Sequence, residues 1–420
     1  MNVRHPVAIA VLACSGLAFA DEAPTAGAVI TTYADIAAAG YTDSLSTART
    51  LREAIGDFIA SPGEESLERA RGAWKEARVP YQQTEVYRFG NPLVDDWEGK
   101  VNAWPLDEGL IDYVDASYGQ ESEDNGLYTA NLVANPSLSI DGEMVDASSI
   151  TPALLGNTLH EAGGIESNVA TGYHAIEFLL WGQDLNGNEA GAGTRPWSDY
   201  AKGDECTNGN CDRRTDYLVA ATDLLITDLE EMAGSWAEGG EARESIVSDE
   251  GALARMLTGM GSLSYGELAG ERMQLGLMLH DPEDEHDCFA DNTAASHYYD
   301  GVGIRNVFEG RYERVDGSVV EGASLRDLLA AADPALADEL GADIDASVSE
   351  LGDMLESQQN GRAYDQLIAQ GDDEGNAMVQ EAIDALIVQT RGIERAVAAL
   401  DVSIEIEGSD SLDDPSAVFQ

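Results

Sequence analysis

Apolar residues recur at helical spacing over most of this 420-residue chain. Between residues 51 and 59 they fall on one face of a predicted helix, which Ser61-Pro62-Gly63 ends. A longer apolar stripe near the C-terminus is typical of a helix packed in a bundle, and it consists of Val379, Ile383, Leu386, Thr390, Ile393, Val397 and Leu400. The pattern predicts an all-α fold.

Two short segments break the helical pattern. Residues 138–145 alternate between apolar and polar side chains around Asp141-Gly142, and residues 312–320 do the same around Asp316-Gly317. An Asp-Gly pair within such alternation is a strong signal for a β-hairpin. We therefore expect two small hairpin inserts in an otherwise helical protein.

The two hairpin segments also resemble each other, because residues 140–150 align with residues 315–325. A Leu-rich helical segment follows each of them. A duplication would give two related helical-bundle halves, about 21–235 and about 245–405, related by a pseudo-twofold axis. Chance similarity between two short hairpins is the alternative. The polar and acidic residues 406–420 are predicted to form a frayed tail.

The first 20 residues have the pattern of a secretory signal peptide. Arg4 and His5 precede an apolar run over residues 6–17, and Ala18-Phe19-Ala20 supplies a small-x-small cleavage pattern. The run is shorter than the roughly 20 apolar residues that span a bilayer. We expect export to the periplasm or cell envelope. Lipoprotein anchoring at Cys14 is disfavoured, because the residues before it match a lipoprotein cleavage box weakly.

The net charge of the chain excludes some classes of binding partner. The chain has 23 Lys and Arg residues against 78 Asp and Glu residues, a net charge of −55. Such a field repels nucleic acid and anionic lipid and attracts cations. A metal-collecting surface and adaptation to salty surroundings both explain it. Because the acids are spread along the whole chain, solubility in salt is favoured, and nucleic acid is excluded as a partner.

Three cysteines remain once the signal peptide is removed. Cys206 and Cys211 bracket a Gly/Asn-containing turn, so an oxidising compartment favours a local disulfide between them. That pairing leaves Cys288 single. A lone cysteine is more often a small buried apolar residue than a reactive group or a ligand.

The sharpest local feature is the segment from Gly172 to Trp181. On a helix, His174 and Glu177 are three positions apart and lie on the same face. An imidazole and a carboxylate at this spacing are what helical-bundle metal sites use. The flanking residues are apolar, so the carboxylate is expected to be buried and to need a partner. The alternative is that the two side chains only satisfy each other or a nearby helix end.

Other polar clusters could face this pair. Tyr81, Glu85 and Arg88 lie on neighbouring helical positions, and Asp107 with Glu108 follows a Trp-Pro turn. In the second half the candidates are the pair Glu267 and Glu271 and the polar run 283–293. Each of these alone is more often a solvated helix face or an N-cap than a site. The chain has no H-E-x-x-H, no C-x-x-C-H, no P-loop and no G-x-S-x-G motif.

Taken together, these blocks resemble the imelysin family, whose signature G-x-H-x-x-E is met by Gly172, His174 and Glu177. The segments 74–90, 104–113 and 283–293 match as well, so the resemblance covers nearly all of residues 21–405. It implies two helical-bundle halves with the functional site between them. It also implies one site per chain, since Ser349 and Gly352 occupy the second half's aligned positions.

By the same resemblance His174 and Glu177 form the core of a metal site. Glu85 and Asp107 are expected as further metal ligands, and Arg88 and Tyr81 as substrate-binding residues.

The family carries a peptidase label, yet hydrolysis by a metal needs three protein ligands, an open water position and a base. A set of histidine and carboxylate ligands suits iron better than a zinc hydrolase. We therefore expect a cell-envelope protein for iron or another divalent metal, free or chelated. An iron-uptake or redox protein of the envelope, for example a permease or an oxidase, is the expected protein partner. The alternatives are a metallopeptidase acting at the same site and a purely structural protein whose polar cluster is a satisfied network.

Overall fold

The computed structural model describes residues 23–122 and 124–419. The predicted signal peptide and Cys14 lie outside these residues. Within them, none of the helices is both long enough and apolar enough to span a membrane.

Helices dominate the structure, as the apolar pattern predicts, and both hairpins are confirmed. Strand β1 (Ser137–Ile140) pairs with β2 (Glu143–Asp146), and β3 (Arg311–Glu313) pairs with β4 (Val319–Glu321), each antiparallel. In the first turn both Asp141, at φ 51°, and Gly142, at φ 84°, are left-handed. The Asp-Gly pair meets this demand because both residue types tolerate that conformation better than others.

The N-terminal bundle is built on one long helix and the helices that pack along it. It contains α1 (Ala26–Ala60), α2 (Glu64–Gln82), α3 (Pro92–Asn102), α6 (Gly172–Trp181) and α7 (Cys211–Trp236). The Oγ1 atom of Thr25 accepts the N–H of Ala28 at 3.2 Å and caps α1. Leu51, Ile55 and Phe58 of the predicted apolar face are buried and Ile59 is partly buried, and α1 ends at Ala60, directly before the predicted stop.

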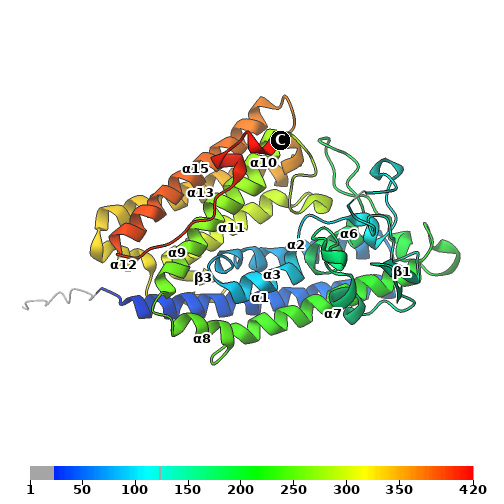
Figure 1. Ribbon diagram of the computed structural model, residues 1–420, viewed down its shortest axis with the longest axis horizontal. Coiled ribbons are helices and arrows are strands. Elements are labelled where there is room, and N and C mark those ends of the chain that lie inside the picture. The colour runs from blue at the N-terminus through cyan, green and yellow to red at the C-terminus, as the bar shows by residue number, and fades with distance from the viewer. Residues whose placement is uncertain (1–22, 123, 420) are drawn as a thin grey trace, which may run out of the picture.

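The second bundle rises above the first in Figure 1, from green through yellow to red. It contains α9 (Ala252–Ser262), the π-helix η7 (Leu263–Gln274), α10 (Leu275–Leu279), α11 (Thr293–Glu309), α13 (Pro334–Gln359) and α15 (Asp373–Ala399). The first three of these elements run on without a break. The predicted apolar stripe of α15 is buried at Val379, Ile383, Leu386 and Ile393.

The remaining elements are short. The α-helices among them are α4 (Glu108–Ile111), α5 (Pro152–Leu154), α8 (Glu241–Val247), α12 (Leu325–Ala332), α14 (Tyr364–Leu367) and α16 (Asp410–Asp413). Another π-helical turn is η3 (Leu155–Leu159). The 3₁₀ turns are η1 (Glu85–Tyr87), η2 (Ala116–Tyr118), η4 (Ala162–Gly164), η5 (Trp197–Tyr200), η6 (Gly203–Glu205), η8 (Cys288–Ala290) and η9 (Ala417–Phe419).

The two bundles share one hydrophobic core, to which buried apolar residues of both contribute. Helix α2 of the first bundle packs on α11 of the second. The second hairpin crosses to the first bundle as well. There Asp43 of α1 accepts hydrogen bonds from the Tyr312 hydroxyl at 3.0 Å and from Arg314 Nη2 at 2.6 Å. The boundary between the bundles is therefore a tightly joined interface. The duplication itself stays a prediction.

The C-terminal segment differs from the frayed tail that its polar sequence predicts. It runs back along the second bundle (Figure 1) and packs on η7. The N–H of Glu407 donates to Ser262 Oγ at 3.0 Å, and Ser411 Oγ donates to the carbonyl of Gly270 at 3.0 Å. A Cβ at Gly266 would lie 2.7 Å from the Glu407 carbonyl oxygen, so glycine leaves the room that the segment occupies. Hydrogen bonds to serine thus add to the apolar contacts that Ile404 and Leu412 make with the core.

The predicted disulfide between Cys206 and Cys211 is present, with an S–S distance of 2.00 Å. Cys288 is free and buried, as expected of a lone cysteine, with 2% of its surface exposed.

Candidate metal centre

Helix α6 begins where only a glycine fits. Gly172 has φ +78°, and a Cβ built on it would lie 2.4 Å from the carbonyl oxygen of Val101, at the end of α3. The indole N–H of Trp74 donates to the carbonyl of Tyr173 at 3.0 Å and holds the same turn from α2. All ten residues of α6 are buried. The glycine of the G-x-H-x-x-E motif thus allows the close approach of α6 to α3, which positions the histidine.

His174 and Glu177 are hydrogen-bonded to each other, as one reading of the sequence predicts. The Nδ1 atom of His174 lies 3.0 Å from Oε2 of Glu177, and the other carboxyl oxygen accepts the N–H of Ala290 at 2.9 Å. Both side chains are fully buried, and Nε2 of His174 has no hydrogen-bond partner. Burial, followed by the nearby Arg78 charge, lowers the pKa of His174 to about 3. Burial, followed by the Asp287 charge, raises the pKa of Glu177.

Two residues of the loop before α11 join His174. One ligand atom each of His174, His286 and Asp287 lies within 4.8 Å of the others, and all three residues are buried. The rings of His174 and His286 are 4.9 Å apart, and the ring of Trp104 lies 5.0 Å from that of His174. Nδ1 of His286 is also buried without a hydrogen-bond partner. A buried nitrogen lone pair or N–H without a partner is costly, so this cluster has free capacity for a ligand.

Asp287 is held in place by a buried arginine. Arg78 of α2 donates from Nη2 to Oδ1 at 2.7 Å and from Nε to Oδ2 at 3.2 Å, and its Nη1 donates to Asn102 Oδ1 at 2.6 Å. Asn292 and Ser296 also donate to Oδ2 of Asp287. Burial by itself raises the pKa of Asp287, but the Arg78 charge and these bonds lower it to about 2. The cluster therefore contains an ionised carboxylate whose charge a guanidinium balances.

A cavity of about 340 Å³ reaches the cluster at His286. Its wall includes Trp104 and Pro105, residues of η7, and the loop after α10, and its lining residues are Trp104, Pro105, Glu267, Glu271, Arg272, Leu275, Glu283, Asp284, Glu285 and His286. A π-helical turn closes between residues five apart, so positions 267, 271 and 272 share one face. The π-helix thereby directs two acids and an arginine toward one cavity.

The structure places the other predicted ligands in separate interactions. Glu85 is buried and lies 3.3 Å from Arg272 Nη2, while that arginine also contacts Asp300 and Glu267 at 2.8 Å each. Asp107 accepts from Asn125 Nδ2 at 2.5 Å and from Ser167 Oγ at 2.7 Å. Among the described residues, the group that could hold a metal thus contains His174 but not Glu177, Glu85 or Asp107.

The two predicted substrate-binding residues are engaged within the fold. Tyr81 is 1% exposed, and its ring lies 4.9 Å from that of Tyr173. Arg88 donates to Asp95 at 2.9 Å and lies 3.7 Å from Glu267, which lines the cavity. Arg88 therefore touches the cavity wall through its partner, whereas Tyr81 supports the helix that carries His174.

His286, Asp287 and Arg78 are the residues that sequence reasoning did not assign to the site. The signal was present, because His286 and Asp287 lie in the polar run 283–293 that carries the family resemblance. Besides Cys288 that run contains six ionisable side chains, and no spacing rule separates a ligand from its neighbours; they are Glu283, Asp284, Glu285, His286, Asp287 and Asp291.

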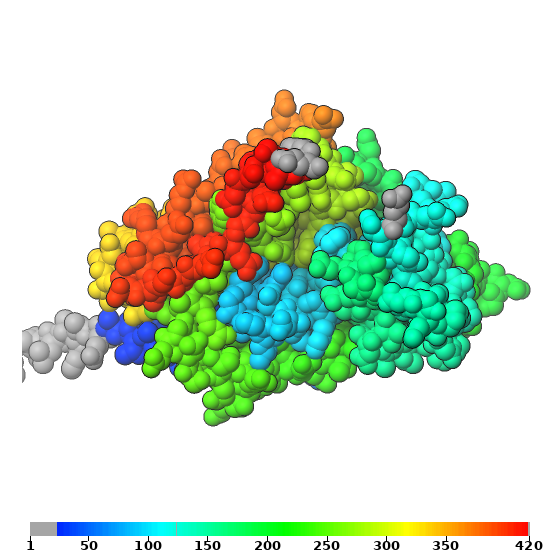
Figure 2. Space-filling model, in the orientation of Figure 1, coloured from blue at the N-terminus to red at the C-terminus, as the bar shows by residue number. Residues whose placement is uncertain are grey.

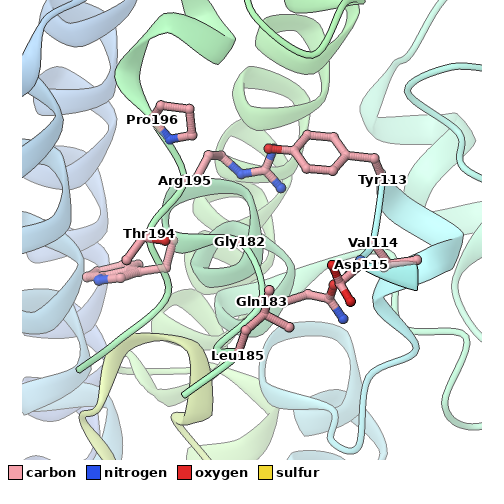
Figure 3. A pocket seen from close by; sticks show the side chains of 10 residues that line it. Tyr113, Val114, Asp115, Gly182, Gln183, Leu185, Thr194, Arg195 and Pro196 are labelled. Carbon is pink, nitrogen blue, oxygen red and sulfur yellow. The ribbon is translucent and has the colours of Figure 1, made fainter. Parts of the chain in front are cut away.

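A second cavity, of about 230 Å³, lies at the opposite end of α6, next to Gly182 (Figure 3). Arg195 and Tyr113 point toward each other there, with the guanidinium carbon 5.0 Å from the ring centre. Nη1 of Arg195 donates to Asp112 at 2.7 Å and to Asp199 at 3.2 Å. The two ion pairs hold Arg195 beside the C-terminal end of α6, where its role is structural. We assign no ligand to this cavity.

The imelysin family model matches residues 37–393 of the chain. Iron-regulated protein A of Synechococcus elongatus is 29% identical to the chain over 85 residues, which are 20% of this chain and 24% of that protein. The matched stretch thus spans about a quarter of the length of that curated relative.

Two solved structures share the fold. A candidate iron-regulated protein A precursor from Parabacteroides distasonis has a TM-score of 0.64 at 18% identity, covering 91% of this chain and 97% of that chain. An imelysin-like protein from Psychrobacter arcticum has a TM-score of 0.59 at 16% identity, covering 91% and 99%. At these identities the likeness shows a common fold.

Proposed function

The chain belongs to the imelysin family, and from this premise we propose that it binds a transition-metal ion, with iron favoured, at His174, His286 and Asp287. The observation that carries the proposal is the clustering of one ligand atom from each of these three buried residues within 4.8 Å. The name of the Synechococcus relative, iron-regulated protein A, supports iron as the metal.

The donor set fits iron on chemical grounds. Two imidazoles and one carboxylate form the ligand combination that non-haem Fe(II) sites use, with positions left open for other ligands. Both histidines have a buried nitrogen without a hydrogen-bond partner, so a metal would satisfy atoms that the protein leaves unsatisfied. Arg78 opposes binding, because its positive charge already balances Asp287. The affinity for the metal should therefore be moderate, which allows the chain to release the metal to a partner.

Glu177 is a positioning residue in this proposal rather than a ligand. Both of its oxygens are engaged, one by His174 Nδ1 and one by the Ala290 N–H. A carboxylate that holds one ring nitrogen of a metal-binding histidine fixes the orientation of the ring and leaves the other nitrogen for the metal. The i, i+3 spacing of the motif is then explained by this hydrogen bond.

The burial of the metal-binding residues favours metal binding over peptide hydrolysis as the function. His174 and Asp287 are fully buried, and the cavity that reaches the cluster is about 340 Å³. A peptide bond could reach a metal held there only if the loop before α11 moved. Hydrolysis at this site is the alternative function, with Glu283 or Glu285 of the cavity wall as the candidate base.

The predicted signal peptide supports a location in the periplasm or cell envelope. We propose that the chain holds the metal there and passes it to an uptake or redox protein of the envelope. The strongly negative charge, −55 over the whole chain, favours a partner with a basic docking surface.

Calorimetric titration with Fe²⁺ under anaerobic conditions, together with elemental analysis, tests the proposal. We expect one site per chain, lost in His174→Ala and in His286→Ala. Glu85→Gln is the matched control, because Glu85 is a buried acid of the first bundle that contacts Arg272 rather than the cluster. Equal binding by the wild type and both histidine variants would refute the assignment. A peptidase assay with a chelator control tests the alternative.

A further inference from the structure

The cavity beside the metal cluster has a strongly acidic wall. Five of its lining residues are acids, namely Glu267, Glu271, Glu283, Asp284 and Glu285, against the single arginine Arg272. Helix η7 carries the first two acids and Arg272, and the loop after α10 carries the other three acids. The face of the molecule where α3 meets the second bundle is seen in Figure 2.

The one arginine of the cavity wall is already paired with carboxylates of the protein. Arg272 contacts Glu267 at 2.8 Å, Asp300 at 2.8 Å and Glu85 at 3.3 Å, so three carboxylates share its charge. Glu271 accepts the Ser409 hydroxyl at 2.6 Å, which is a neutral donor. Among the described residues, no basic side chain forms a salt bridge with Glu271, Glu283, Asp284 or Glu285. The cavity wall therefore gathers four acids that no basic side chain of the described residues pairs with.

An unsatisfied side chain marks the inner end of this wall. Glu285 is 4% exposed, and neither of its oxygens has a partner at normal hydrogen-bond geometry. His286, the next residue, lines the same cavity and has an unpartnered Nδ1. A buried carboxylate without a partner is costly, and a cation in the cavity removes that cost.

The cavity volume suits a small hydrated ion. Six waters at roughly 30 Å³ each occupy about 180 Å³, which the cavity of about 340 Å³ accommodates. An iron chelate with carboxylate or catecholate groups would place its negative charges against four unbalanced acids. A field of this sign concentrates cations and raises their association rate, and it slows anions.

We propose that this cavity admits the metal as a hydrated, uncomplexed divalent cation and discriminates against metal held in an anionic chelate. The inference rests on the proposed metal site at His174, His286 and Asp287 and names the form in which its cargo arrives. Glu271 and Glu283, which are exposed, act as an electrostatic entrance, and Glu285 and His286 are buried residues of the same wall. The chain then receives iron only after a preceding reaction has released it from its chelator or reduced it.

Stopped-flow fluorescence tests this inference, because the Trp104 ring lies 5.0 Å from His174 and should report the arrival of iron. The probes are Fe²⁺ under anaerobic conditions and Fe³⁺-citrate. The test variant is Glu271→Gln/Glu283→Gln. The control variant is Asp345→Asn/Asp353→Asn, which removes the same charge from two exposed positions of α13.

We expect Fe²⁺ to bind the wild type rapidly and Fe³⁺-citrate to give no saturable binding. At low salt the test variant should associate with Fe²⁺ about tenfold more slowly, with a weaker dependence on ionic strength. The control variant should stay within about twofold of the wild type. Association of the test variant as fast as that of the control, or binding of Fe³⁺-citrate as tight as that of Fe²⁺, overturns the inference and leaves the metal site standing. Failure of the wild type to bind Fe²⁺ overturns both.

Discussion

His174 and Glu177, three residues apart on α6, are joined by a contact of 3.0 Å between Nδ1 and Oε2, and Glu177 continues to the Ala290 N–H at 2.9 Å. One carboxyl group thus connects the motif helix to the loop that carries His286 and Asp287. The contact orients the imidazole and joins the two halves of the chain at the same point.

Substituting Glu177 with Gln should weaken metal binding while preserving the fold. Glutamine keeps the shape of the side chain and one hydrogen-bond acceptor. It lacks the negative charge that makes the His174 imidazole a better metal ligand. Loss of such a partner typically costs about 10- to 100-fold in metal affinity. Titration calorimetry measures this change, and thermal unfolding in the presence of a chelator checks the fold. Unchanged affinity would show that Glu177 has no part in holding the metal-binding histidine.

Removing Arg78 should destabilise the metal-free protein strongly. Arg78 and Asp287 form a buried pair with side-chain exposures of 1% and 0%. Loss of one partner from a buried pair leaves an uncompensated charge and costs about 3–5 kcal/mol. Urea unfolding of Arg78→Met in the presence of a chelator measures this loss. Arg78→Met/Asp287→Leu should recover part of it, because no buried charge is then left alone.

An exposed pair provides the control for that experiment. Arg49 and Glu230 lie 2.6 Å apart with side-chain exposures of 56% and 51%. Arg49→Met should cost less than about 1 kcal/mol, since water screens the pair. Equal losses for Arg78→Met and Arg49→Met would contradict the assigned role of the buried pair.

Stability of the metal-free protein should be greatest in mildly acidic solution. Burial raises the pKa of Glu98, Glu283 and Asp365 to about 7, with Glu85, Glu108 and Asp291 as the respective charged neighbours that add most. These carboxyls bind protons more tightly in the folded state, so their contribution is present at low pH and is lost as the pH rises through about 7. Burial lowers the pKa of His174 and His297 to about 3, and that contribution is lost as the pH falls below about 6.5.

The carboxyls with a raised pKa outnumber the histidines with a lowered pKa. The midpoint temperature of thermal unfolding should therefore rise as the pH is lowered from 8 to about 5.5, and it should fall below about pH 4. Circular dichroism melts with a chelator at constant ionic strength measure this profile. Glu283→Gln should flatten the rise, whereas Asp345→Asn, on the exposed face of α13, should not. A midpoint that decreases steadily from pH 8 to pH 5.5 would show that the histidines dominate.

Thiol titration should distinguish the three cysteines of the exported protein. The Cys206–Cys211 bridge removes two thiols, and the remaining Cys288 is 2% exposed. We expect almost no reaction with a thiol reagent in the native protein and one reacting thiol after denaturation without reductant. Reduction should lower the unfolding free energy by about 2 kcal/mol or less, because the closed loop is short. Three reacting thiols in the denatured, unreduced protein would contradict the bridge.

Local pattern was sufficient for several features. The hairpins follow from Asp141-Gly142 and Asp316-Gly317, because Asp141, Gly142 and Gly317 all take the left-handed conformation, which few residue types accept. The disulfide follows from the turn that separates Cys206 from Cys211. The pairing of His174 with Glu177 follows from their spacing on one helical face. In each case the interacting groups are close in the chain, so local geometry decides the outcome.

The partners of the motif required the tertiary structure. Glu85 and Asp107 have the same local appearance as a ligand, yet Arg272 binds the first across 187 residues and Ser167 and Asn125 bind the second. His286 and Asp287 reach His174 only because the loop before α11 folds back, and Glu177 accepts the Ala290 N–H across 113 residues. With 78 acids in the chain, the sequence offers too many equivalent carboxylates to identify which ones lie near the histidine.

The sequence by itself thus determined the helical fold, the hairpins, the disulfide and the histidine-carboxylate pair, because short-range sterics and hydrogen bonds control each of them. The tertiary structure alone decided the ligand set, the acidic cavity and the course of the C-terminal segment. A polar side chain takes whichever partner packing brings within about 3 Å, and that choice depends on contacts between residues far apart in the chain. The C-terminal segment shows the same rule, since Gly266 and Gly270 of η7 leave the space in which Glu407 and Ser409 lie.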